Sequence, residues 1–296
     1  MKIFRIQQLI DTVRNYIDSI SRVKIKLYYI GKAKHHNAGD MFNINIMRYL
    51  GLEFKKVRAT NANTFCIGSI LNSIVVQPKL NNQKNKICNI LGAGFSNIPE
   101  QSEILAKNIK VYALRGKLSK EILENLTQKN IDCILADPGL LVSYLYPYYT
   151  TTKLHKVGII PHFEDKNDIL LKNIQLNKYN YKIIDIEDDI ETIAKDINCS
   201  ECILSSSLHG LIFSDSFGIP NRQISLSKKK NNFKYKDYYS SFNQNLPRII
   251  DLQQEIITDE TIDEILNSYT CKKEKVKEKQ NELLETFEKF LIDISH

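Results

Sequence analysis

The chain has 296 residues, of which 43% are hydrophobic and 25% charged, a balance typical of a globular protein with room for two domains. The 41 Lys and Arg residues against 34 Asp and Glu give a net charge of +7, which favours anionic ligands. No run of about 18 apolar residues is present and the N-terminus is too polar for a secretory signal, which excludes a membrane-spanning or secreted protein.

Residues 3–20 carry Ile and Val side chains spaced alternately by three and four positions, which predicts a helix with one apolar stripe. Arginines flank the stripe. The apolar stripe of this helix has three possible partners: its own domain, an anionic membrane surface, or a second copy of the chain. Because the N-terminus is polar and no long apolar run is present, we expect a cytoplasmic protein. The contacts open to this helix leave its oligomeric state and a peripheral contact with the inner face of the membrane undecided.

Short apolar runs alternate with helical patterns as far as residue 150, which predicts an α/β unit with a parallel sheet. We expect strands at 23–30, 63–67, 86–91, 110–113 and 133–136, and helices at 41–50 and 117–126. The polar and glycine residues beside the strand ends are Asn37, Gly39, Asp40, Gly92, Gly94, Arg115 and Asp137. Because the carboxyl ends of parallel strands meet at one edge, we expect these residues to border a ligand crevice.

Several of these residues have a functional and a structural interpretation. Asp40 either caps the helix that follows or accepts a proton from a substrate hydroxyl. Arg115 either clamps a carboxylate or phosphate bidentately, or caps a surface loop. Asp137 begins an Asp-Pro-Gly turn and either anchors that turn or holds Arg115. The lone Gly92-Ala93-Gly94 lacks the rest of a dinucleotide fingerprint, so we predict no NAD binding.

The pattern breaks at 142–153, a segment rich in tyrosine and threonine that we interpret as a linker. A second α/β series follows, with strands expected at 156–160, 182–185, 202–204 and 223–226 and helices at 168–176, 190–198, 259–268 and 272–294. The basic, aromatic segment 228–239, which includes Lys234, is expected to be a loop that is either solvated or in contact with an anion. We therefore predict Rossmann-like domains at 1–150 and 151–270, and a C-terminal helix at 271–296 that packs back on the first domain.

The most informative stretch is 202–220, which predicts a strand, a tight turn and a helix. An apolar run ends in Ser205-Ser206-Ser207, and His209-Gly210 opens a helix that Gly218 closes. A helix N-terminus offers unpaired N–H groups that suit a phosphate or carboxylate. Two interpretations fit: an anion-binding and proton-transfer centre, or a serine cap beside a packed histidine.

Other candidate ligands are few. His162 follows the strand expected at 156–160 and is placed at the same crevice. Cys199 and Cys202 have the spacing of a zinc pair, but no second pair or histidine cluster accompanies them, so we predict no metal site.

Seven short motifs occur in an order and spacing that resemble one family. They are Asn-Ala-Gly-Asp (37–40), Leu-Gly-Ala-Gly-Phe (91–95), Ala-Leu-Arg-Gly (113–116), Ala-Asp-Pro-Gly (136–139), Pro-His (161–162), Ser-Ser-Leu-His-Gly (206–210) and Phe-Lys-Tyr-Lys-Asp-Tyr (233–238). Together they are similar to the polysaccharide pyruvyl transferase family. Where many relatives carry a tryptophan in the last motif this chain has Tyr235, and it contains no tryptophan, so sugar stacking falls to Tyr and Phe.

The resemblance implies a fold similar to that of GT-B glycosyltransferases, an α/β architecture in which two Rossmann-like domains face a cleft. It implies transfer of the pyruvyl group of phosphoenolpyruvate to sugar hydroxyls of an exopolysaccharide or capsule, or of a lipid-linked precursor, with release of phosphate. Phosphoenolpyruvate is then the donor substrate, no cofactor is needed, and no nucleic-acid partner is expected.

Carried over to matching positions, the family's roles fall on the residues already singled out. His209 would protonate the methylene carbon of the donor, Arg115 would grip its carboxylate or phosphate, and Asp40 would orient or deprotonate the acceptor hydroxyl. The remaining expected substrate-binding residues are Asn37, Gly39, Gly92, Gly94, Asp137, His162, Ser205, Ser207, Gly210 and Lys234.

Two other functions stay open. A nucleotide-sugar glycosyltransferase on a similar scaffold would need a pocket for the base and an acidic contact to the ribose, neither of which the sequence reveals. A non-catalytic scaffold in a glycan assembly complex would not need His209 and Arg115, whose presence counts against it.

Overall fold

The computed structural model describes residues 25–31, 37–75, 87–99, 109–148, 150, 152–175, 180–227, 231–269 and 273–295. The helix expected at 3–20 and residues 228–230 of the basic segment lie outside these ranges. A contact of that helix with a membrane, a partner or its own domain therefore stays a prediction.

Six parallel strands form the first sheet, in the order β2-β1-β3-β4-β5-β6. They are β1 (Ile25–Tyr28), β2 (Phe54–Lys56), β3 (Thr64–Phe65), β4 (Cys88–Leu91), β5 (Ile109–Leu114) and β6 (Ile134–Leu135). The sequence analysis missed β2, because both lysines of this edge strand are exposed and leave no apolar run to recognise.

Five parallel strands form the second sheet, in the order β11-β10-β9-β7-β8. They are β7 (His155–Ile160), β8 (Tyr181–Ile183), β9 (Ser200–Ser205), β10 (Asn221–Ser225) and β11 (Ile250–Asp251). The two parallel sheets with their helices confirm the α/β class. The boundary expected near residue 150 falls between β6 and β7, and the division into domains stays a prediction.

Most helices lie where the spacing of apolar residues predicts them, apart from the four-residue α3, which the sequence analysis missed, and two further exceptions. The α-helices are α2 (Ala38–Tyr49), α3 (Asn72–Val75), α4 (Lys117–Thr127), α5 (Val142–Leu145), α6 (Ile169–Gln175), α7 (Ile190–Asn198), α8 (Leu208–Phe217), α9 (Phe233–Ser240), α10 (Asp259–Ser268) and α11 (Lys273–Ser295). Short 3-10 turns are η1 (Ala59–Asn61), η3 (Pro138–Leu141) and η4 (Phe163–Asp165).

The first exception is the segment expected to be a loop at 228–239, which forms α9 instead. Tyr235, Tyr238 and Tyr239 stand at positions i, i+3 and i+4, so three aromatic rings are buried on one face. The lysines between them masked this spacing. The second exception is the expected linker at 142–153, whose first residues form α5 and pack against α8.

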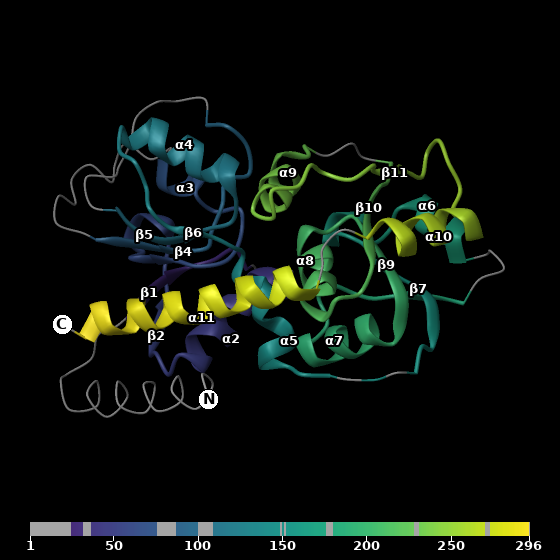
Figure 1. Ribbon diagram of the computed structural model, residues 1–296, viewed down its shortest axis with the longest axis horizontal. Helices are drawn as coiled ribbons and strands as arrows, with labels where there is room; N and C mark the ends of the chain where they lie inside the picture. Colours follow the sequence, from purple (N-terminus) through teal and green to yellow (C-terminus); the bar gives the residue numbers. More distant parts are fainter. Residues whose placement is uncertain are drawn as a thin grey trace.

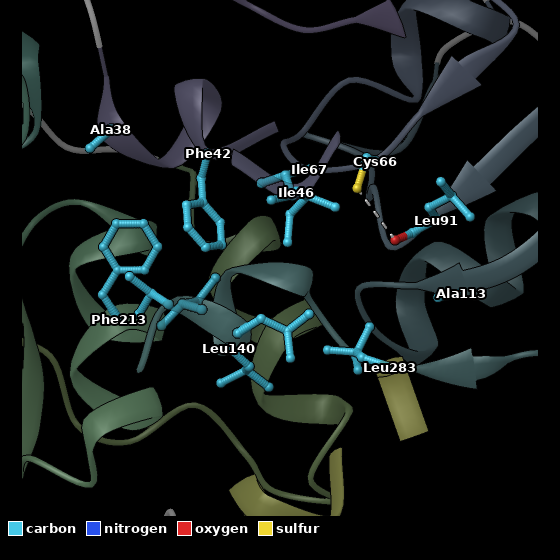
Figure 2. Close-up of a cluster of buried hydrophobic side chains, with 14 of the residues drawn as sticks. Ala38, Phe42, Ile46, Cys66, Ile67, Leu91, Ala113, Leu140, Phe213 and Leu283 are labelled. Carbon is cyan, nitrogen blue, oxygen red and sulfur yellow. Dashed lines mark hydrogen bonds between the residues drawn. The ribbon is translucent and has the colours of Figure 1, made fainter. Parts of the chain in front are cut away.

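One hydrophobic core joins elements from both sheets. Figure 2 shows Phe42 of α2, Leu140 of η3, Phe213 of α8 and Leu283 of α11 in this cluster. The rings of Phe42 and Phe213 meet edge to face, with centroids 5.8 Å apart. The long helix α11 runs beneath the first sheet towards α8 (Figure 1) and contacts β5, β6, η3 and α8. The core therefore holds α2 and α8, which carry predicted site residues, at a fixed separation.

None of the helices in the described part of the chain has both the length and the apolar character needed to cross a bilayer.

The docking of α11 gives a test of this core. Leu283→Ala should lower the free energy of unfolding by about 2–5 kcal/mol, because it removes a fully buried side chain from the core that joins the two sheets and leaves a cavity there. Ile292→Ala on the same helix is the control and should change it by about 0.5 kcal/mol, because that side chain is 46% exposed. Urea denaturation measures both, and equal losses would contradict the assignment of α11 to the core.

Candidate active site

The turn between β9 and α8 is built from serine hydroxyls bonded to backbone groups. Ser205 Oγ lies 2.7 Å from the Ile160 carbonyl and 2.9 Å from the Ser207 carbonyl, and it accepts from the Ser207 N–H at 3.0 Å. A Cβ at Gly210 would lie 2.3 Å from that hydroxyl, so the first turn of α8 requires glycine there. Ser205 and Gly210 thus shape the turn, and a phosphate contact from Ser205 or Ser207 stays a prediction.

His209 lies in the first turn of α8 and is 7% exposed. Burial is the main cause that lowers the pKa of this imidazole to about 3, and the positive charges of Lys234 and Arg115 lower it further. The ring is therefore neutral at physiological pH. Its Nε2 is buried without a hydrogen-bond partner among the described residues. Such an atom costs about 1–3 kcal/mol, which marks it as a candidate for a functional contact.

The N-terminus of α2 lies against His209. Asn37 Oδ1 caps the helix by accepting from the Gly39 N–H at 2.9 Å, and the Ala38 N–H donates to the Ile186 carbonyl, after β8 of the second sheet, at 2.7 Å. A Cβ at Gly39 would lie 1.9 Å from His209 Nδ1. Glycine is therefore needed at this position so that the imidazole can approach the helix backbone.

Two carboxyl groups with raised pKa values face this region. Burial raises the pKa of Asp40 to about 7; Lys234 and Lys56 oppose the shift and the nearby Asp137 adds to it. Burial also raises the pKa of Asp137 to about 6, although the hydrogen bond from the Gly139 N–H and the positive charge of Arg115 each lower this pKa. Asp137 Oδ2 has no hydrogen-bond partner among the described residues. Acids with pKa values near neutrality can both accept and release protons during turnover.

Arg115 is the largest fully buried side chain of the described residues, and its guanidinium is engaged on three sides. Nε and Nη2 each lie 2.9 Å from Asp237 Oδ2 of α9, and Nη1 donates to Ser69 Oγ at 2.7 Å. Nη2 also donates to the Phe95 carbonyl at 2.5 Å. A substrate that contacts this buried guanidinium must replace one of these partners, so a grip on the donor stays a prediction.

Asp237 also caps α4, which has no capping side chain of its own at Gly116. Its Oδ1 accepts from the Ser119 N–H at 2.8 Å and its Oδ2 accepts from the Ser119 hydroxyl at 2.6 Å. A Cβ at Gly116 would lie 1.7 Å from the Asp237 carbonyl oxygen, so only glycine permits α9 to approach this closely. The sequence analysis gave Asp237 no role, although its place in the Lys-Asp-Tyr motif and its charge opposite to Arg115 were available signals.

Two predicted glycines support the turns that hold charged groups. Gly92 has φ +122°, and a Cβ there would lie 2.3 Å from Pro138 Cδ, next to Asp137. A Cβ at Gly94 would lie 2.5 Å from Arg115 Cζ. Substrate contacts from Gly92 and Gly94 stay predictions.

The predicted site residues thus form one group and one outlier. Asp40, Asp137, Arg115, His209 and Lys234 share electrostatic interactions, and Asn37 and Gly39 adjoin them. The backbone N–H of His162 donates to Ser206 Oγ at 2.9 Å, which places this residue at the Ser206 turn. Its ring, however, accepts from the Glu164 N–H at 3.4 Å and packs on Phe163, so in this conformation the side chain caps η4. Among the described residues no cluster of His, Cys, Asp or Glu is suited to hold a metal ion.

Comparisons with known proteins identify the family of the chain. A family model described as polysaccharide pyruvyl transferase matches residues 6–228. The chain is 30% identical over 234 residues to an uncharacterized protein of Acanthamoeba polyphaga mimivirus, across 75% of each chain. It is 26% identical over 210 residues to the succinoglycan biosynthesis protein ExoV of Rhizobium meliloti, which covers 71% of this chain and 63% of ExoV. A crystal structure of an uncharacterized protein from Klebsiella pneumoniae aligns with 85% of this chain and 98% of that chain at 16% identity and a TM-score of 0.43, too low to establish a shared fold.

The electrostatics of His209 can be tested by NMR. The His209 imidazole resonances should not titrate between about pH 5 and 8, because its pKa of about 3 lies below that window. Lys234→Met should raise the pKa, since it removes a nearby positive charge. Lys236→Met, an exposed lysine on the same helix, should leave it unchanged. A wild-type midpoint near the ordinary value of 6.5 would contradict the buried, neutral ring.

The buried pair of Arg115 and Asp237 predicts a large loss of stability on removal of one charge. Asp237→Asn should lower the free energy of unfolding by about 3–5 kcal/mol, because it leaves the guanidinium buried without its counter-ion. Asp259→Asn makes the same change in an exposed pair with Lys156 and should cost at most about 1 kcal/mol. Equal effects in urea denaturation would refute the special role of Asp237.

Proposed function

Since the chain belongs to the polysaccharide pyruvyl transferase family, we propose that it transfers the pyruvyl group of phosphoenolpyruvate to hydroxyls of a sugar. The acceptor is proposed to be a hexose of a surface polysaccharide or of its lipid-linked precursor. The name of ExoV, a succinoglycan biosynthesis protein, supports a place in polysaccharide biosynthesis. Phosphate is the second product, and the reaction as proposed needs no cofactor.

The observation that carries the proposal is the buried, neutral His209 with an unpartnered Nε2 beside the positive charges of Lys234 and Arg115. Cations that face a neutral base attract an anionic ligand. A bound phosphoenolpyruvate anion would offset those charges and raise the pKa of His209, which allows the ring to carry a proton. The imidazole would thus become an acid only when the donor is in place.

The proposed chemistry balances in protons. His209 protonates the methylene carbon of phosphoenolpyruvate, which leaves the neighbouring carbon oxocarbenium-like, and a sugar hydroxyl attacks that carbon and gives its proton to Asp40. A second hydroxyl of the same sugar displaces the phosphate, which departs with the proton from Asp40, and the proton of this hydroxyl restores His209. The pKa of Asp40, about 7, suits a group that takes and returns a proton.

Lys234 and Arg115 have different roles in this proposal. Lys234 lowers the pKa of both Asp40 and His209, so its ammonium is the candidate for the donor's phosphate or carboxylate. Arg115 is a positioning residue, because it fixes through Asp237 the helix that carries Lys234. A direct grip of Arg115 on the donor would require the donor to replace Ser69 at Nη1 or Asp237 at Nε and Nη2.

We extend the proposal to the architecture and location. The two parallel sheets would act as a GT-B-like pair of domains that face a cleft, with the boundary near residue 150. The enzyme would work in the cytoplasm on glycans assembled at the inner face of the membrane.

The donor can be tested without knowledge of the acceptor. Phosphoenolpyruvate should raise the melting temperature of the wild type, and Lys234→Met should weaken this effect while Lys236→Met retains it. His209→Gln should keep the stabilisation but lower phosphate release with an acceptor glycan by about 10²–10⁴-fold, because it removes the proton donor. Stabilisation by nucleotide sugars and not by phosphoenolpyruvate would overturn the proposed function.

A further inference from the structure

A polar cavity of about 300 Å³ opens at the carboxyl edge of the second sheet. Its polar lining comes from five elements or their ends and consists of Asp165, Ser206, Gln223, Ser225, Asn232, Tyr235 and Asp251. This edge of an open parallel sheet is where ligands bind in α/β proteins, and the volume is at the lower end of the range for small-molecule pockets. The cavity is therefore suited to one small ring.

The side chain of Gln223 provides the observation that points to a ligand. Gln223 is 5% exposed, and its Nε2 donates to Asn232 Oδ1 at 3.1 Å. Its Oε1 is buried and has no hydrogen-bond partner among the described residues. A buried amide oxygen in a pocket wall is costly unless a ligand donates to it. A ligand O–H or N–H group that donates to this oxygen would remove that cost.

The charge of the lining narrows the ligand class. Asp165, held by a 2.6 Å bond from the Ser206 hydroxyl to its Oδ2, and Asp251, which accepts from the Gln253 N–H at 3.1 Å, place two carboxylates in the wall. Carboxylates accept hydrogen bonds from hydroxyl groups and repel phosphate and carboxylate ligands. The aromatic ring of Tyr235 and the side chain of Ile249 supply apolar surface. A neutral ring that carries several hydroxyls matches this lining, and phosphoenolpyruvate does not.

We propose that this cavity binds a neutral sugar ring through its hydroxyl groups. It shares the Ser206 turn with the candidate active site: Tyr235 donates from its hydroxyl to the Ser206 carbonyl at 2.7 Å, and Lys234 and His209 are close in sequence to these two residues. The cavity is then the subsite for a sugar of the acceptor glycan, an assignment that rests on the proposed function. The inference that the cavity binds a sugar ring does not depend on the proposed function.

Saturation-transfer NMR on the full chain tests the site, with the methyl glycosides of glucose, galactose and mannose as probes and uridine diphosphate as the source of a ribose. Transfer to the ring protons of at least one methyl glycoside is expected. Gln223→Leu and the conservative Asp251→Asn should each weaken it about tenfold, since each removes an acceptor of a hydroxyl. Glu201→Gln makes the same charge change as Asp251→Asn at the exposed amino end of β9 and should have no effect.

Each outcome decides the proposal. No transfer to any probe, or equal transfer in the wild type and in both pocket variants, would overturn the sugar site. Transfer to the ribose alone, lost in the pocket variants, would support the site and overturn its assignment to the acceptor. The melting temperature with phosphoenolpyruvate serves as an independent readout: it should rise in the pocket variants as in the wild type. An absent rise in the wild type would count against the proposed function and leave the sugar result standing.

Discussion

The buried ion pair between Arg115 and Asp237 is the interaction on which the site depends. Both side chains are at most 1% exposed, and the carboxylate also satisfies the N–H and hydroxyl of Ser119 at the start of α4. Buried charges of this kind persist only where nearly all their hydrogen bonds are made. The pair therefore fixes α9 to the first sheet in one register, and α9 carries Lys234 towards the imidazole and carboxyl groups between the sheets. The positive charge at the site is thus a consequence of how the two sheets are joined.

The sequence could predict most of the fold because the parallel strands are buried and read as short apolar runs. The turn before α8 could also be predicted, because serines, His209 and Gly210 directly follow such an apolar run. Helix α9 could not be predicted, because lysines are interspersed among the tyrosines of its buried face. The ion-pair partner of Arg115 could not be predicted from the sequence either. Asp237 lies 122 residues further along the chain, and only tertiary packing brings the two side chains together. Residue types with chemical roles were predictable, and their pairings were not.

The proton chemistry of the site follows from burial more than from any single neighbour. Burial is the largest influence on His209, Asp40 and Asp137, and in each case it favours the neutral form. At neutral pH the site without ligand accordingly holds a neutral imidazole, an Asp40 that is divided between its protonated and ionised forms, and a mostly ionised Asp137, beside the fixed cations. An anion that enters such a site changes the proton affinity of all three groups at once, which couples donor binding to readiness for proton transfer.

The two sides of the Ser206 turn differ in charge, which supports the proposal that they take different ligands. On the side of His209 the nearby fixed charges are Lys234 and Arg115, which suit a small anion. On the side of Gln223 the charged groups among the described residues of the wall are Asp165 and Asp251, which suit hydroxyl donors. A transferase that joins an anionic donor to a neutral sugar needs this separation, because one surface that attracted both would let the donor occupy the acceptor's place. The shared turn joins the two sides through the bond from the Tyr235 hydroxyl to the Ser206 carbonyl, so in the proposed reaction the sugar in the cavity would lie beside the turn that leads into His209.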